Sequence, residues 1–217
     1  MGRLEELIAE HCPDGVEYKK LGDIGTFVRG SGLTKKDLDT SGEPCIHYGQ
    51  IHTQYYLETN HTLSYVRKEL YDRLKKAEHG DVLLAGVSED MEGVCKPVSW
   101  KGEGDVAISG DMFAFQHKQV PNYIVYALLT HDFYLYKAKF VRGAKVKRLS
   151  TKRLEEYRIP LPPIEVQNEI VRILDTFTEL TQELTKELEL RQKQYEFYRD
   201  ALLTFEAVTT KRIGENI

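Results

Sequence analysis

The sequence predicts an α+β fold in which a globular body, with a twisted or barrel-like antiparallel β-sheet and flanking helices, is followed by one long C-terminal helix. Residues 1–160 hold many short runs of β-branched and aromatic residues separated by glycine, which is typical of short strands. Strands and helices do not alternate there in the regular way of a doubly wound fold. A proline-rich segment then leads into a long heptad repeat of apolar residues, which predicts the helix.

Length and composition limit the possible classes of protein. The chain has 217 residues, enough for one large domain or one domain with an appendage, and its 41% hydrophobic residues exclude a disordered or collagen-like chain. Its three cysteines, Cys12, Cys45 and Cys95, lie too far apart for a close-spaced metal set or a disulfide framework. No apolar stretch is long enough to span a bilayer. We therefore expect a cytoplasmic protein with no membrane partner and no bound metal.

The body begins with an amphipathic helix and continues with short strands. The helix is predicted over Arg3–His11, and Pro13-Asp14-Gly15 ends it. The strands are predicted at Val16–Lys20, Thr26–Arg29, Pro44–Ile51, Asp81–Val87, Val94–Trp100, Val106–Ser109 and Met112–His117. Two further helices are predicted at Lys68–Ala77 and Asn122–Lys139.

The long helix is predicted to start after Pro160-Leu161-Pro162-Pro163, because proline is accepted in the first turn of a helix but not in its interior. An alternating step of four and three residues then runs without a break along one face. This heptad ladder comprises Ile170, Leu174, Phe177, Thr181, Leu184, Leu188, Arg191, Tyr195, Tyr198, Leu202 and Phe205. Such a repeat predicts a coiled coil with the apolar ladder residues at the dimer interface, where Thr181 and Arg191 can fix the register. The alternative is a long helix that packs against its own domain.

These features divide the chain into three parts. Residues 1–160 are predicted to form the globular domain, and residues 161–206 the long helix. The heptad pattern is lost after the last ladder residue, so residues 207–217 are predicted to be a tail.

No motif in the sequence predicts catalysis. Asp14, Glu17 and Lys19 spell the letters of a nuclease metal site, but two residues between the acids leave no room for the strand return that would bring them together. There is no G-x-G-x-x-G, H-x-x-x-H or G-x-S-x-G pattern. We expect no catalytic residue and no cofactor bound by this chain.

A basic run and a glycine-rich turn are the first candidates for a binding surface. Eight Lys and Arg and no acidic residue lie between Lys137 and Arg153, which suits a phosphate backbone, although a solvated surface gives the same pattern. Arg29-Gly30-Ser31-Gly32 is followed by Lys35 and Lys36. A flexible turn beside cations can contact phosphate, and a plain hairpin turn is the alternative.

A polar alternation follows in the next predicted strand or loop. Tyr48, Gln50, His52 and Gln54 share one face there. Glutamine can read base edges and tyrosine can stack on bases. Any half-buried strand can show the same alternation.

With these parts in order, the sequence resembles the specificity subunit of type I restriction-modification enzymes. The matching segments are Cys12–Glu17 leading into Leu21–Ile24, Glu43–Ile46, Gly80–Leu84, Gly143–Ser150 and Ile159–Val171. The last is the most specific, and together they span nearly the whole chain. Family members carry two target-recognition domains, each followed by a long helix, and the two helices lie antiparallel. This chain has one domain and one helix, so it resembles half of such a subunit.

The resemblance implies a subunit that recognises double-stranded DNA and has no active site of its own. The implied partners are modification subunits, which methylate adenine with S-adenosylmethionine, and ATP-driven restriction and translocase subunits. S-adenosylmethionine, ATP and Mg²⁺ are then expected on those partners. The residues expected to hold phosphates are Arg142, Lys145, Lys147 and Arg148, and those expected closer to base edges are Tyr48, Gln50 and Ser88.

Pairing of two copies through the heptad ladder would make the two half-sites identical and the DNA target an interrupted palindrome. A second interpretation is a truncated specificity chain that acts as a structural adaptor or modulator and pairs with another specificity subunit. The third is a self-contained nuclease or methyltransferase, which the missing motifs disfavour.

Overall fold

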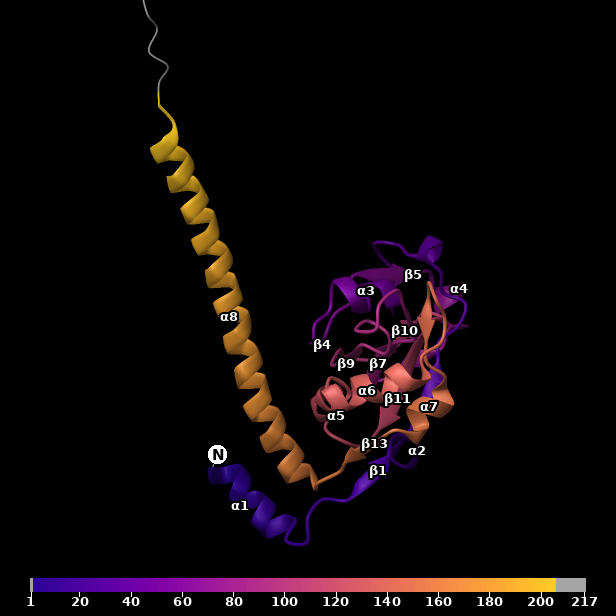
Figure 1. The fold of residues 1–217 in the computed structure, drawn as a ribbon. Helices are drawn as coiled ribbons and strands as arrows, with labels where there is room; N and C mark the ends of the chain where they lie inside the picture. The colour runs from indigo at the N-terminus through magenta and orange to yellow at the C-terminus, as the bar shows by residue number, and fades with distance from the viewer. Residues whose placement is uncertain (1, 206–217) are drawn as a thin grey trace, which may run out of the picture. The chain divides into compact units, whose positions relative to one another are not determined.

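The computed structural model describes residues 2–205 and shows an α+β fold with a long C-terminal helix, which confirms the predicted class (Figure 1). The helices are α1 (Gly2–His11), α2 (Leu21–Ile24), the 3-10 helix η1 (Lys35–Asp37), α3 (Tyr48–Thr53), α4 (Lys68–Tyr71), α5 (Pro121–Leu128), α6 (His131–Phe140), α7 (Thr151–Glu156) and α8 (Ile164–Leu203). The strands are β1 (Tyr18–Lys20), β2 (Gly25–Arg29), β3 (Glu43–Ile46), β4 (Glu58–Thr59), β5 (Ser64–Val66), β6 (Lys76–Ala77), β7 (Val82–Ala85), β8 (Val87–Ser88), β9 (Pro97–Trp100), β10 (Val106–Ile108), β11 (Met112–His117), β12 (Lys147–Arg148) and β13 (Arg158–Pro160).

The chain divides into two compact units, residues 1–171 and residues 172–217. The globular unit therefore continues past the predicted boundary at residue 160 and includes the first turns of α8. The predicted tail at residues 207–217 lies outside the described residues.

A five-stranded sheet in the order β2-β11-β7-β9-β4 forms the centre of the globular unit. All four residues of β7 are buried. Val82 and Leu84 belong to one core cluster and Leu83 and Ala85 to another, because successive side chains of a strand point to opposite faces. Since both faces are covered, β7 is a continuous apolar run in the sequence.

Two different layers cover the central sheet. Helices α5, α6 and α7 cover one face, where Phe133 and Leu154 are fully buried (Figure 1). A four-stranded sheet in the order β5-β3-β10-β6 covers the other, and its Ile108 shares a core cluster with Met112 of β11. A smaller cluster around Cys45 covers the outer face of this second sheet. The core thus lies in three layers.

Both sheets are mixed, and within residues 2–205 both are open. β3 pairs with β10 in parallel, with Ile46 opposite Ile108, and β4 pairs with β9 in parallel, with Glu58 opposite Ser99. The prediction of an antiparallel sheet is therefore wrong for these two pairs, and neither sheet closes into a barrel. The partners of each parallel pair are far apart in the chain, so their directions are set by packing and by long crossovers rather than by a local turn.

The predicted strand Pro44–Ile51 is wrong in its second half, because a helix begins there. β3 ends at Ile46, and His47 caps α3. The Gly49 amide donates to His47 Nδ1 at 3.2 Å, and the His47 amide donates to Gln50 Oε1 at 2.9 Å. This reciprocal cap satisfies two amides that the first turn of a helix leaves unpaired.

The two internal helices are shorter than predicted. α4 ends at Tyr71, and the chain continues into β6, which pairs with β10. The predicted helix Asn122–Lys139 is two helices, since α5 ends at Leu128 and the Thr130 hydroxyl caps α6 by accepting from the Phe133 amide at 3.3 Å. The helical spacing of apolar residues continues across this point in the sequence, but the side-chain cap ends one helix region and begins another.

The long helix begins where the prolines predict. Pro163 O accepts from the amides of Val166 and Gln167 at 3.0 Å each. The fully buried Gln167 side chain accepts from the Val120 amide at 3.1 Å and donates to Pro162 O at 2.8 Å and to Gln119 Oε1 at 2.9 Å. This network fixes the first turn of α8 to the globular unit. The helix ends at Leu203, before Phe205, and so is slightly shorter than predicted.

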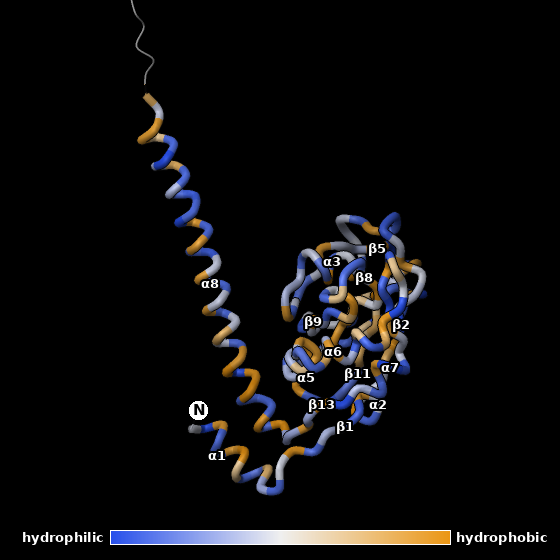
Figure 2. The backbone as a smooth tube through the Cα atoms, viewed as in Figure 1, coloured by the Kyte–Doolittle hydropathy of each residue, from blue (hydrophilic) through white to orange (hydrophobic). Residues whose placement is uncertain are grey.

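The heptad ladder lies on an exposed face of α8. Its 40 residues correspond to about 60 Å, and apolar and polar residues alternate along it (Figure 2). Phe177, Leu184 and Leu188 are 63%, 57% and 67% exposed. Ile170 differs, because it packs against the core of the globular unit.

His117 gives the globular unit a pH-dependent stability. Burial lowers the pKa of His117 from 6.5 to about 4, and its buried Nε2 has no hydrogen-bond partner among the described residues. The unfolded chain takes up this proton as the pH falls below 6.5, whereas the folded chain does so only near pH 4. The free energy of unfolding should therefore fall between pH 6.5 and 4, by at most about 3 kcal/mol from this group.

His117→Asn should reduce this loss. Asparagine retains an acceptor for the Gln119 amide, which donates to His117 Nδ1 at 3.1 Å, but it does not titrate. Urea unfolding at several pH values measures the difference, with the exposed His131→Asn as the control. An equal pH dependence in His117→Asn and the parent chain would contradict the assignment.

Candidate nucleic-acid interface

A short hairpin collects most of the predicted phosphate-binding residues. β12 pairs with β8, so that Lys147 lies opposite Ser88. The backbone amide of Arg142 donates to Arg148 O at 3.0 Å, and that of Arg148 donates to Arg142 O at 2.9 Å. Gly143, with φ +103°, makes the turn, where a Cβ atom would collide with Val146 O. Arg142, Lys145, Lys147 and Arg148 therefore lie within one hairpin, and their contacts with phosphates stay predictions.

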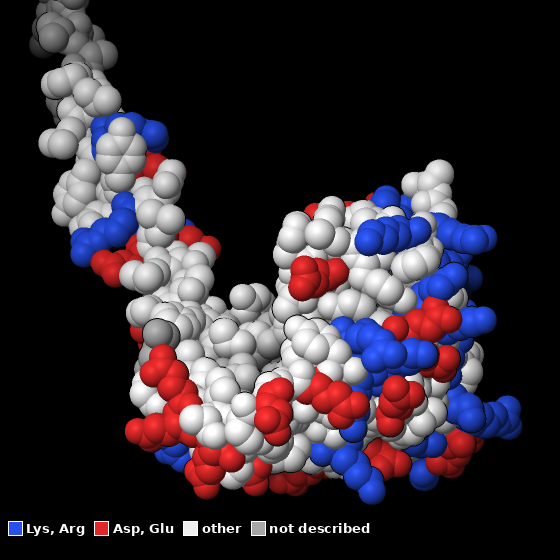
Figure 3. Space-filling model, turned by 60° about the horizontal axis from the view of Figure 1, so that its bottom comes forward, with Lys and Arg blue, Asp and Glu red and all other residues white. Residues whose placement is uncertain are grey.

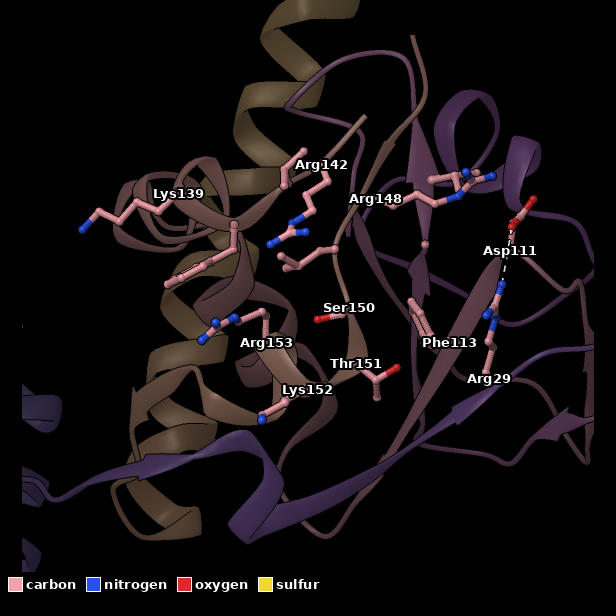
Figure 4. A pocket seen from close by; sticks show the side chains of 15 residues that line it. Arg29, Asp111, Phe113, Lys139, Arg142, Arg148, Ser150, Thr151, Lys152 and Arg153 are labelled. Atoms are coloured by element: carbon pink, nitrogen blue, oxygen red, sulfur yellow. Dashed lines mark ion pairs between the residues drawn. The ribbon is translucent and has the colours of Figure 1, made fainter. Parts of the chain in front are cut away.

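The hairpin borders a hollow of about 790 Å³ that we call the basic hollow. Its charged lining residues are six cations and one acid: Arg29, Lys139, Arg142, Arg148, Lys152, Arg153 and Asp111. In the view of Figure 4, the Ser150 hydroxyl lies between the Arg142 side chain above and the Lys152 and Arg153 side chains below. These residues come from β2, β11, α6, the hairpin and α7. Such an excess of positive charge in a concave surface attracts phosphate.

The cations of the basic hollow differ in how firmly they are held. Arg29 Nε donates to Gly110 O at 3.1 Å, and its guanidinium lies 4.0 Å from Asp111. Arg153 is 2.6 Å from Glu156 and stacks over another side chain of the lining, that of Phe140. The exposed side chains of Arg142, Arg148, Lys139 and Lys152, by contrast, make no hydrogen bond or ion pair within residues 2–205. These four cations are the ones available to an anionic ligand.

Two lysines of the basic run serve the fold. Lys137 is 5% exposed, and its ammonium donates to Val94 O at 2.8 Å and Glu92 O at 3.2 Å. Burial lowers the pKa of Lys137. Lys147 Nζ donates to Glu89 O at 2.6 Å. Both lysines thus support the loop that follows β8, so the basic run is not one uniform surface.

The glycine-rich turn is divided between two places. Arg29 lies at the end of β2 and lines the basic hollow, whereas Ser31, Lys35 and Lys36 do not line it. Lys35 and Lys36 are exposed on η1, whose start is capped by hydrogen bonds between Thr34 and Asp37. The structure therefore brings only Arg29 of this group to the hairpin cations.

The three residues expected near base edges are half-buried or buried. Tyr48 and Gln50 lie on α3, not on a strand. Gln50 Nε2 donates to Ser64 Oγ at 2.7 Å, and Gln50 Oε1 accepts from the His47 amide in the α3 cap. The Ser88 hydroxyl donates to Asp90 Oδ1 at 3.2 Å, and Ser88 is 9% exposed. Base contacts by these residues remain predictions.

Lys139, Lys152 and Arg153 belong to the site but were not among the predicted site residues. All three are part of the basic run in the sequence. Membership of this run was the available signal, whereas α7, which carries Lys152 and Arg153, was not predicted from the sequence. Figure 3 shows Lys and Arg gathered on one side of the globular unit, with Asp and Glu among them.

A comparison with protein-family models matches residues 13–191 to the type I restriction modification DNA specificity domain. The chain belongs to this family. The chain is similar to the Escherichia coli type I restriction enzyme EcoR124I/EcoR124II specificity subunit, with 28% identity over 88% of the chain and 48% of that relative. It is also similar to a putative type I restriction enzyme specificity subunit of Haemophilus influenzae, with 31% identity over 86% of the chain and 47% of that relative.

Solved structures share the fold of this specificity domain. A chain from a study of complex assembly in a type I R-M system has a TM-score of 0.66 and 17% identity, and the HsdS subunit of Thermoanaerobacter tengcongensis has 0.55 and 20%. Each comparison covers 92% of this chain and 49% of the other. The specificity-domain chain thus spans about half the length of the relatives it matches.

Two kinds of feature are absent from the described residues of this specificity domain. No helix within residues 2–205 is long and apolar enough to cross a membrane. No group of three or more His, Cys, Asp or Glu in the same range could hold a metal ion.

Proposed function

We propose that this chain is the DNA-recognition subunit of a type I restriction-modification complex and that it reads one half of a bipartite target. The family match carries the proposal, because residues 13–191 include most of the globular unit and more than half of α8. The basic hollow supports it with four cations available to DNA phosphates. In this role the chain positions adenine methyltransferase subunits, and restriction subunits where present, on the DNA.

The proposed complex contains two copies of this chain, and the exposed apolar ladder on α8 supports this homodimer. Relatives about twice as long match this chain over about half their length. Two copies joined through the heptad ladder would supply two recognition domains, and their two-fold symmetry would make the target an interrupted palindrome. S-adenosylmethionine, ATP and Mg²⁺ would be bound by the partner subunits.

The test is a genome-wide map of methylated adenines. The chain is co-expressed with its methyltransferase subunit in a host free of adenine methylation, and the methyltransferase alone is the control. We expect methylation of an interrupted palindrome that depends on this chain. An asymmetric split motif would show pairing with a different recognition domain, and no motif with both proteins folded would favour the adaptor interpretation.

A further inference from the structure

We propose that two copies of this chain pair along α8 in one antiparallel register, which Thr181 and Arg191 select by facing each other. The inference rests on the proposed homodimer and adds the residue-by-residue pairing. Its starting point is the exposed apolar face of α8. Tyr195, Tyr198 and Leu202 are 64%, 53% and 73% exposed. A face of this length and regularity is typical of a helix that packs on another helix.

The two polar residues of the heptad ladder have complementary chemistry. The Thr181 hydroxyl donates to Phe177 O at 2.7 Å, so its oxygen can still accept a hydrogen bond. Arg191 has five N–H donors and no acceptor. Two of its nitrogens already contact Gln194 at 3.3 Å and Glu187 at 3.4 Å, which leaves further N–H groups for a partner. A layer that joins Thr181 to Arg191 therefore matches a donor with an acceptor.

Parallel pairing in register would bring like groups together. Arg191 of one copy would face Arg191 of the other. Two cations would then share one layer of the interface, and neither helix would offer the other an acceptor there. Thr181 would face Thr181. The antiparallel arrangement avoids this repulsion, whereas the Glu187 carboxylate, 3.4 Å from Arg191 in the same helix, accompanies the charge in either arrangement.

Other antiparallel registers leave the polar groups unmatched. A shift by one heptad in either direction places Arg191 against an apolar residue, Leu174 or Leu188. Thr181 would then face Leu184 or Tyr198. The N–H groups of Arg191 that its own helix leaves unpaired would then be buried without an acceptor, at a cost of about 1–3 kcal/mol, and two-fold symmetry repeats the mismatch. Among these registers, one joins the two polar residues.

The same register pairs the remaining ladder residues apolar to apolar. Facing pairs, each occurring twice, are Leu184 with Leu188, Phe177 with Tyr195, Leu174 with Tyr198, and Ile170 with Leu202. The Ile170 pair lies at the rim, because Ile170 also contacts its own core. Phe205 has no facing ladder residue in this register.

The distribution of charge along α8 agrees with antiparallel pairing. The first half of the helix is acidic, with Glu165, Glu169, Asp175, Glu179 and Glu183 against Arg172. The second half is balanced, with Lys186, Arg191, Lys193 and Arg199 against Glu187, Glu189, Glu196 and Asp200. Antiparallel pairing places the acidic half beside the balanced half, whereas parallel pairing places it beside itself.

Disulfide cross-linking tests the register directly. Two differently tagged full-length copies are co-expressed, one with Phe177→Cys and one with Tyr195→Cys, and the unsubstituted pair is the control for the buried native cysteines. We expect a cross-link between the two tags, because these positions face each other. A self-cross-link of Phe177→Cys alone, or a dimer mass without the mixed cross-link, would overturn the register. A monomeric parent chain in light scattering would instead overturn the homodimer itself.

A charge substitution provides a second, independent readout. Thr181→Glu should tighten the dimer roughly two- to thirty-fold, because each glutamate would face one arginine of the partner helix, and the dimer would contain two such pairs. Adding Arg191→Gln should remove the gain. Thr176→Glu, at an exposed position off the ladder, is the matched control. Weaker association of Thr181→Glu would show that residue 181 faces another glutamate or an apolar residue instead of Arg191, and the proposed register would be wrong.

Discussion

Replacing Leu184 and Leu188 with aspartate is expected to abolish self-association at micromolar concentration. Each leucine would contribute about 1.5–3 kcal/mol on burial, and the dimer contains two copies of each. The loss corresponds to roughly four or more orders of magnitude in the dissociation constant, before the desolvation of the carboxylates is counted. Light scattering and sedimentation measure the mass, and circular dichroism checks that the helix persists.

A matched control adds the same charge elsewhere on the helix. Thr176→Asp with Gln182→Asp places two carboxylates at exposed positions off the heptad ladder and should leave the dimer intact. Because the two half-sites must be held by one particle, the ladder variant should also lose methylation of the target. A dimer mass for the Leu184→Asp, Leu188→Asp variant would mean that another surface joins the copies.

Replacing Arg142 and Arg148 with glutamine is expected to weaken DNA binding about a thousandfold at physiological salt. Four phosphate contacts would be lost per dimer, and each contributes about 0.9 to the slope of log K against log salt. The magnitude of this negative slope should therefore decrease by roughly four. Random and target duplexes should weaken by the same factor, because phosphates carry no sequence information. Fluorescence anisotropy across a salt series gives both quantities.

The control for this variant is Lys186→Gln with Lys193→Gln on α8, which removes the same charge from outside the globular unit. Its salt slope should equal that of the parent chain. The Arg142 and Arg148 side chains make no hydrogen bond or ion pair within residues 2–205, so the thermal midpoint should change little. An unchanged salt slope in the Arg142→Gln, Arg148→Gln variant would exclude the basic hollow as the phosphate-binding surface.

The features predicted correctly from the sequence are those encoded by neighbouring residues. Prolines at positions 160, 162 and 163 mark the start of α8, because a proline restricts its own backbone and that of the residue before it. The apolar run at Val82–Leu84 marks a strand, which was predicted at Asp81–Val87 and is found as β7. The heptad ladder likewise identifies one helix face, since its spacing depends only on helix geometry.

The errors have two sources, a local helix cap that the prediction missed and a distant strand that pairs with a predicted helix. The segment after Ile46 became α3 because His47 and Gln50 cap each other, although the polar alternation there suits a strand equally well. Lys76 joined a sheet because β10 lies beside it. The cap is encoded within four residues, whereas the pairing of Lys76 depends on a strand about thirty residues away along the chain.

The candidate site shows the same division. The sequence by itself determined that eight cations and no acidic residue fall between Lys137 and Arg153. Only the tertiary structure decided that Lys137 supports a loop from inside the protein, and that Arg29, from a distant strand, lines the basic hollow. The reason is physical: charge is a property of the residue, whereas burial and the partners that stabilise a charge depend on how the whole chain packs.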